Sequence, residues 1–242
     1  MLWRKAWLEC RYRFLLCYFM SLSVTFAALV RPPKPWEQAL AAAAIGGEER
    51  LFRVVFGLLA VRVVPVGALI LAGSGINTQT SWGMTHGFHP SMYFLLSMPV
   101  TREQLLRIRV LMGLGLLFVW TVTTAGVVLL ATHWGKLAMD PGRVFATLPN
   151  LLVGAVLFYA FSVFLTAFLD EYWAGMTALL VMGMLGGYGV AEGPGGANLL
   201  AYMMSQSLVA GDLEAWAKAG IFLAISAAFY LAAWRVVAAK EY

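Results

Sequence analysis

Charged residues are scarce in this chain of 242 residues. Asp, Glu, Lys and Arg make up 12% of it, and hydrophobic residues make up 61%. Because an ordinary globular domain carries about twice that share of charge, too few polar side chains are present to cover a water-facing surface. The composition therefore excludes a soluble globular domain and predicts a protein that lies in a lipid bilayer.

A concentrated block of basic residues is also missing. The formal net charge is +5, and the Lys and Arg residues that produce it are spread along the chain. Proteins that bind nucleic acid gather such residues in a patch or stripe, so no nucleic-acid partner is expected. The anionic headgroups of membrane lipids are the expected counter-charge.

The chain has only two cysteines, Cys10 and Cys17. Seven residues apart on one helix, their Cα atoms would lie roughly 10 Å apart, beyond the reach of a disulfide. We therefore expect both to behave as small apolar residues within the membrane.

A phosphate-binding loop is absent from the sequence. Such a loop needs Gly-x4-Gly-Lys-Ser/Thr, so that backbone amides and a lysine meet the phosphates, and the glycine-rich stretches at 73–75 and 186–196 lack that lysine. His86 and His89 are spaced closely enough to share a metal ion, but no Asp, Glu or Cys stands near them in the sequence. We therefore predict no catalytic residue, no metal ligand and no cofactor site in this chain.

Six long apolar segments fill most of the sequence. A helix needs about 20 predominantly apolar residues to cross the hydrocarbon core of a bilayer. The predicted spans are residues 14–30, 54–76, 105–130, 148–169, 174–190 and 219–237. The predicted fold is therefore a single all-α polytopic membrane domain, residues 1–242, with six transmembrane helices. Lys and Arg are slightly enriched on the side of the two termini and before the first span, which favours cytoplasmic termini.

Two further segments flank these spans. Residues 1–13 place Trp3, Trp7 and Cys10 on one helical face, which predicts an interfacial helix leading into the membrane; the alternative is a charged start to the first span. Before the sixth span, residues 192–212 contain a break at 192–196 and then an apolar stretch at 199–210 that is too short to cross a bilayer. This pattern indicates a re-entrant or outer-face segment, or else an ordinary loop with a surface helix.

The connection between the second and third spans is predicted to contain a short apolar helix at residues 90–99. Pro90 can open this helix and Pro99 ends it. Thr101 then offers an N-cap with Gln104 three residues on, a capping box that would start the next helix. The apolar residues between the prolines are Met92, Tyr93, Phe94, Leu95 and Leu96, with Ser91 and Ser97 at the ends. Such residues suit a groove in a partner protein; the alternative is an amphipathic turn that lies on the bilayer.

The run from His89 to Arg102 resembles the signature of type-2 ATP-binding-cassette (ABC) permeases. In that family a leucine-leucine-x-leucine/serine-x-proline-valine-x-arginine pattern precedes the third span. Here Leu95, Ser97, Pro99, Val100 and Arg102 match the pattern, and Phe94 stands at its first leucine. The six spans, the N-terminal helix and the broken apolar stretch before the last span extend the resemblance over the whole chain.

The resemblance implies a transmembrane subunit of an exporter in the bacterial cytoplasmic (inner) membrane. The segment at 90–99 would be a cytoplasmic coupling helix that docks on a separate ATPase subunit, with Arg102 beside it. ATP and Mg²⁺ would be bound by that partner, and a second permease copy or a homologue would complete the dimer. The alternative from another class is a self-sufficient secondary transporter or polytopic enzyme, which would need acidic or histidine relays inside the membrane.

Arg62 is the one charged residue inside the predicted second span. A charge within the bilayer indicates a functional contact by default, here with an anionic substrate on a translocation path or with a carboxylate elsewhere in the assembly. The alternative is that the span begins later and Arg62 extends to the outer headgroups. The sequence leaves both interpretations open.

Overall fold

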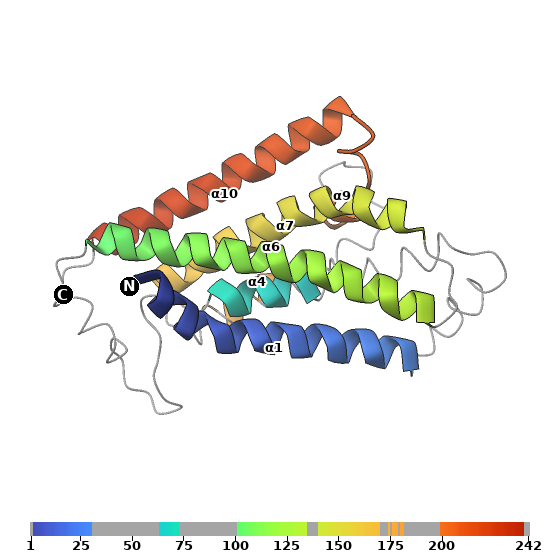
Figure 1. Ribbon diagram of the computed structural model, residues 1–242. Coiled ribbons are helices and arrows are strands. Elements are labelled where there is room, and N and C mark those ends of the chain that lie inside the picture. The colour runs from blue at the N-terminus through green and yellow to red at the C-terminus, as the bar shows by residue number, and fades with distance from the viewer. Residues whose placement is uncertain are drawn as a thin grey trace.

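The computed structural model describes residues 2–30, 63–72, 101–134, 140–169, 174, 176–178, 180–181 and 199–239. Its regular secondary structure within these ranges is helical (Figure 1). The helices are α1 (Leu2–Val30), α4 (Val64–Ala72), α6 (Arg102–Trp134), α7 (Pro141–Phe168), α9 (Leu199–Met204) and α10 (Leu213–Ala239). The all-α prediction is confirmed for this part of the chain.

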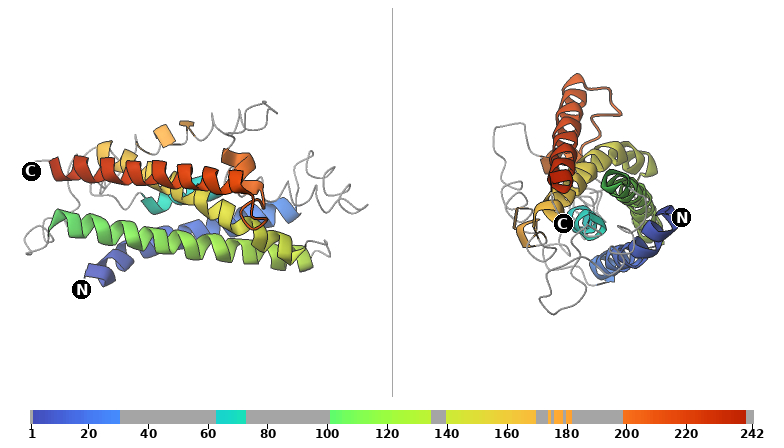
Figure 2. Two further views of the ribbon diagram at one scale, coloured as in Figure 1. Left: turned by 90° about the horizontal axis from the view of Figure 1, so that it is seen from above. Right: turned by 90° about the vertical axis from the view of Figure 1, so that its left-hand side faces the viewer.

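Helix α4 lies in the middle of the bundle, and α7 lies between α4 and the last two helices, α9 and α10. α4 packs against α1, α6 and α7, which surround it in the end-on view of Figure 2. α7 also packs against α9 and along α10. Figure 1 shows α1 and α6 beginning at the same end of the bundle, where α10 finishes. We call this the Arg102 end, and the opposite end, where α7 and α10 begin and α9 lies, the Leu213 end.

Three of the helices in the described ranges are long and apolar enough to cross a membrane: Leu106–Leu130, Pro141–Ala167 and Leu213–Ala239, of 25, 27 and 27 residues. They correspond to the predicted spans 105–130, 148–169 and 219–237. An all-helical chain with several such helices has the pattern of a multi-pass membrane protein.

Two of these helices begin earlier than predicted, because N-capping residues precede them. α7 begins at Pro141 after Asp140, whose Oδ1 accepts a hydrogen bond from the Gly142 amide at 2.9 Å. α10 begins at Leu213 after Asp212, whose Oδ1 accepts one from the Glu214 amide at 3.0 Å. An aspartate at the N-cap satisfies an amide that would otherwise lack a partner, which fixes the start of the helix.

The other predicted segments are described in part. The predicted interfacial helix 1–13 and first span 14–30 form one continuous helix, α1. α4 covers 64–72 of the predicted second span, and the helical residues 174, 176–178 and 180–181 fall in the predicted fifth. The coupling helix at 90–99 and Arg62 lie outside the described residues, as do residues 192–198 of the predicted re-entrant segment.

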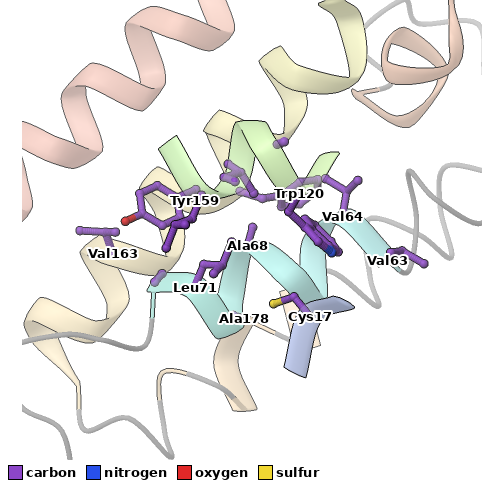
Figure 3. Close-up of a cluster of buried hydrophobic side chains, with 14 of the residues drawn as sticks. Cys17, Val63, Val64, Ala68, Leu71, Trp120, Tyr159, Val163 and Ala178 are labelled. Atoms are coloured by element: carbon purple, nitrogen blue, oxygen red, sulfur yellow. The ribbon is translucent and has the colours of Figure 1, made fainter. Parts of the chain in front are cut away.

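The core is built around the indole of Trp120, which is completely buried (Figure 3). Its Nε1 donates a hydrogen bond to the Ser21 hydroxyl of α1 at 2.9 Å, and its six-membered ring covers Gly67 of α4. Cys10 and Cys17 are both free and buried, as predicted from their spacing. The indole therefore joins three helices through one polar contact and close packing.

Two further glycines mark close helix contacts. A Cβ atom at Gly113 of α6 would overlap the Tyr159 hydroxyl of α7, and one at Gly154 of α7 would overlap the Met203 side chain of α9. Tyr159 and Met203 are almost fully buried. Small residues let helices approach closely where no water-driven hydrophobic force acts between them, as in a bilayer.

Candidate functional site

Helix α6 begins with a reciprocal capping box. The Thr101 hydroxyl accepts a hydrogen bond from the Gln104 amide at 3.2 Å, and the Gln104 side-chain oxygen accepts one from the Thr101 amide at 3.4 Å. This confirms the predicted box. It fixes the start of a helix of 33 residues directly after the predicted coupling segment.

Charged residues surround this helix start. Arg102, predicted to lie beside the coupling helix, is the first residue of α6. Glu103 and Arg107 form an ion pair of 2.7 Å one turn apart, with side chains 50% and 67% exposed. Such an exposed pair on one helix contributes only about 0.3–0.5 kcal/mol. The Glu103 and Arg107 side chains at the start of α6 are therefore exposed to their surroundings, and the ion pair between them is weak.

The residues that follow Arg62 are buried at the centre of the bundle. Val63 and Val64 are each 2% exposed, and Gly67 faces the indole of Trp120 halfway along α6. α4 runs antiparallel to α1, since Cys17 Sγ lies 3.8 Å from the Gly67 carbonyl and Arg13 Nη1 lies 3.4 Å from the Ile70 carbonyl. The chain after Arg62 therefore enters the packed interior of the bundle.

A polar cluster that the sequence did not indicate holds α9 against α7. Asn150 of α7 is completely buried, and its amide nitrogen lies 3.1 Å from the Tyr202 carbonyl, 2.8 Å from the Ser205 hydroxyl and 3.1 Å from the Ser207 hydroxyl. Ser205 also donates to the Tyr202 carbonyl at 2.8 Å. We call these four residues the Asn150 cluster. The Tyr202 carbonyl, in the last turn of α9, also accepts a hydrogen bond from the Ser205 backbone amide at 3.1 Å, so the cluster adds side-chain donors from α7 and from the turn to this helix end.

The apolar stretch predicted at 199–210 is therefore a short helix followed by a turn. α9 ends at Met204, and the turn closes at Gly211, whose φ of 77° lies in the left-handed region that favours glycine. The Ser205 and Ser207 hydroxyls bond to each other, and the Ser205 hydroxyl also donates to the Tyr202 carbonyl, which offers the chain an alternative to continuing the helix. The segment lies at the Leu213 end, opposite the start of α6.

Two polar atoms at this cluster have no hydrogen-bond partner among the described residues. They are the Asn150 side-chain oxygen and the Tyr202 hydroxyl, both buried. Burial raises the pKa of the Tyr202 hydroxyl above its ordinary value. The cluster contains an amide and hydroxyls but neither a base nor a carboxylate. Its chemistry suits the positioning of a backbone turn.

In the part of the chain that the structure describes, no three His, Cys, Asp or Glu side chains come together as a metal site. Comparisons of the chain with protein-family models, with curated proteins and with solved structures give no match.

Proposed function

We propose that this chain is the permease subunit of an ATP-driven exporter of the type-2 ABC class, which couples ATP hydrolysis in a separate subunit to export across the cytoplasmic membrane. The observation that carries the proposal is the capping box at Thr101 and Gln104, which starts α6 directly after the apolar segment at 90–99. The capping box supports the proposal because a movement of the segment at 90–99 would act directly on the start of a transmembrane helix.

The helix directions support the same architecture. α1 and α6 run from the Arg102 end, whereas α7 and α10 run toward it (Figure 1). α4, between α1 and α6 in the chain, runs antiparallel to α1. In a six-span permease, successive spans alternate in direction. The directions of α1, α4, α6, α7 and α10 are those required of spans one, two, three, four and six. This alternation is consistent with the N-terminus, the 90–99 segment and the end of α10 on the cytoplasmic side.

The packing suggests how motion would travel. The ATPase binds ATP and Mg²⁺, closes, and displaces the coupling helix at 90–99, which moves the start of α6. Gly67 against Trp120 and Gly113 against Tyr159 transmit this movement to α4 and α7, since these contacts leave no space to absorb it. Arg62 remains the candidate residue on the translocation path. The alternative is that its side chain extends to the outer lipid headgroups.

α10 supplies a surface for the second subunit or for lipid. Only 17% of its most apolar stretch is buried within the chain, against 61% for α7. Its exposed apolar residues include Leu213, Trp216, Ile221 and Leu231. A second permease copy or a homologue, together with lipid, would cover this face in the complete exporter.

Replacing Phe94 or Leu95 with Asp is expected to release the ATPase. A carboxylate cannot enter an apolar groove without losing its hydration, and a central contact of this kind changes affinity by about tenfold or more. The measurement is the amount of ATPase that co-purifies with the chain, together with transport in reconstituted vesicles. Val209→Asp is the matched control, because Val209 is 60% exposed but lies at the Leu213 end.

Normal ATPase association and transport in both Asp variants would refute the docking role of residues 90–99. If no ATPase co-purifies with the parent chain under any condition, the exporter proposal fails, and a self-sufficient transporter or membrane enzyme takes its place.

Cysteines at positions 210 and 239 are expected to react from opposite sides of the membrane. Ala210 and Ala239 are exposed and lie at the two ends of α10, a candidate span. In sealed inverted and right-side-out vesicles, an impermeant maleimide should label Ala239→Cys only from the cytoplasmic face and Ala210→Cys only from the outer face. The parent chain gives the background, because Cys10 and Cys17 are buried. Labelling of both positions from one side would show that α10 does not cross the bilayer.

A further inference from the structure

A cleft of about 360 Å³ opens between α6, α7 and α10 at the Arg102 end. This volume falls at the lower end of the range for small-molecule sites, about 300–1,000 Å³. α6 and α10 converge there, as Figure 1 shows. Its apolar walls include Leu106 and Val110 of α6, Val163 of α7, and Tyr230, Leu231 and Trp234 of α10.

The cleft lies at the level of one membrane interface. Leu106 is the first residue of the candidate span in α6, and Leu231 and Trp234 fall in the last turns of the candidate span in α10. Trp234 is 40% exposed, and tryptophan is enriched where hydrocarbon meets headgroups. An apolar opening at this level faces acyl chains rather than water, so a hydrocarbon chain is the occupant that its walls favour.

The charges at the mouth of the cleft define the headgroup. Arg107 lines the cleft with its side chain 67% exposed. Arg235 is not a lining residue, but it follows Trp234 directly on α10 and is also exposed. Glu103 is the one acidic residue that lines the cleft in the described part of the chain, and it pairs with Arg107 on the same helix face. Among the lining residues these two charges balance, so the additional positive charge that complements an anionic phosphate comes from Arg235, next to Trp234 on α10.

We propose that this cleft binds one anionic phospholipid of the cytoplasmic leaflet. Its acyl chain would lie along Leu106, Val110 and Leu231, and its phosphate would accept hydrogen bonds from the Arg107 guanidinium. The bound lipid would fill the space between α6 and α10 where they converge and hold the start of α6 against α10. This site requires a membrane-embedded chain but not an ATPase partner, so it goes beyond the proposed export function.

Native mass spectrometry of the full-length protein in detergent can test the site. The protein is mixed with equal amounts of dioleoylphosphatidylglycerol and dioleoylphosphatidylcholine, and the fraction that keeps one lipid is measured. The parent should keep phosphatidylglycerol in preference to phosphatidylcholine. Arg107→Gln should reduce the retained phosphatidylglycerol about fivefold, the effect of one cation near an anionic lipid, whereas Arg107→Lys should retain it.

Two variants separate this site from general attraction of lipid. Arg4→Gln removes an exposed cation at the same end but on α1, away from the cleft, and should bind lipid like the parent. Val110→Phe should fill the cleft and reduce retention of phosphatidylglycerol without removing charge. Equal retention of the two lipids by the parent, equal losses in Arg4→Gln and Arg107→Gln, or full retention by Val110→Phe would each overturn the proposal.

Discussion

Replacing Gly67 with alanine is expected to lower the melting temperature of the purified protein by several degrees. The added Cβ would overlap the six-membered ring of Trp120. This indole cannot swing aside freely, because it is completely buried and bonded to Ser21. Forcing an extra carbon into such a core costs about 1–3 kcal/mol, and each kcal/mol lowers the melting temperature of a protein of this size by roughly 2–4 °C.

Matched glycine substitutions on α6 separate packing from helix propensity. Gly113→Ala should destabilise like Gly67→Ala, because a Cβ there would overlap Tyr159, whereas Gly115→Ala meets open space. Alanine favours a helix over glycine by about 0.5–1 kcal/mol, so Gly115→Ala should be neutral or slightly stabilising. A thiol-reactive dye can follow unfolding, since both cysteines are buried in the folded state. Equal melting temperatures for the three variants would contradict the close contacts at Gly67 and Gly113.

Asn150→Asp is expected to release α9 and its turn from α7. The substitution preserves the shape of the side chain but replaces the amide donor with a carboxylate beside the Tyr202 carbonyl. Loss of a buried donor costs about 1–3 kcal/mol, and a buried charge without a partner costs more. Hydrogen exchange at residues 199–212, measured by mass spectrometry, should become at least about tenfold faster. Asn150→Leu should have a smaller effect in the same direction.

Thr147→Val is the control for Asn150→Asp. Thr147 is also completely buried on α7, but its hydroxyl donates at 3.0 Å to the Arg143 carbonyl of its own helix. Its replacement by valine should therefore leave exchange at 199–212 unchanged. If Asn150→Asp and Thr147→Val gave the same exchange rates, the Asn150 cluster would not be what holds α9 in place.

Local signals made several features predictable. The spans of α6, α7 and α10 follow from length and hydrophobicity, and the capping box depends on two residue types three positions apart, Thr101 and Gln104. The early start of α7 also had a local signal, Asp140 followed by Pro141, but it lies outside the apolar run that set the predicted boundary at 148. Hydropathy marks where a helix can cross a membrane, and capping residues mark where it begins.

Other features depend on contacts between distant residues. Asn150 stands in an apolar run, and its partners come more than 50 residues later, so no pattern around it could reveal the cluster. The same holds for Gly67 and Gly113, which differ from Gly115 only in what faces them. The basic residues before residue 14 predicted a boundary between an interfacial helix and the first span; α1 continues as one helix across this position, with Ala6 and Cys10 buried before it and Cys17 and Ser21 buried after it.

The packing of α7 against α4, α6, α9 and α10 has a consequence for how the chain assembles during its synthesis. Trp120, Ser21 and Gly67 all lie before α7, so α1, α4 and α6 can form their shared contact before α7 leaves the ribosome. Tyr159 can then cover Gly113, and only afterwards can Met203 reach Gly154. α10, which packs mainly along α7, joins last. α10 therefore docks on a face that α7 has already provided.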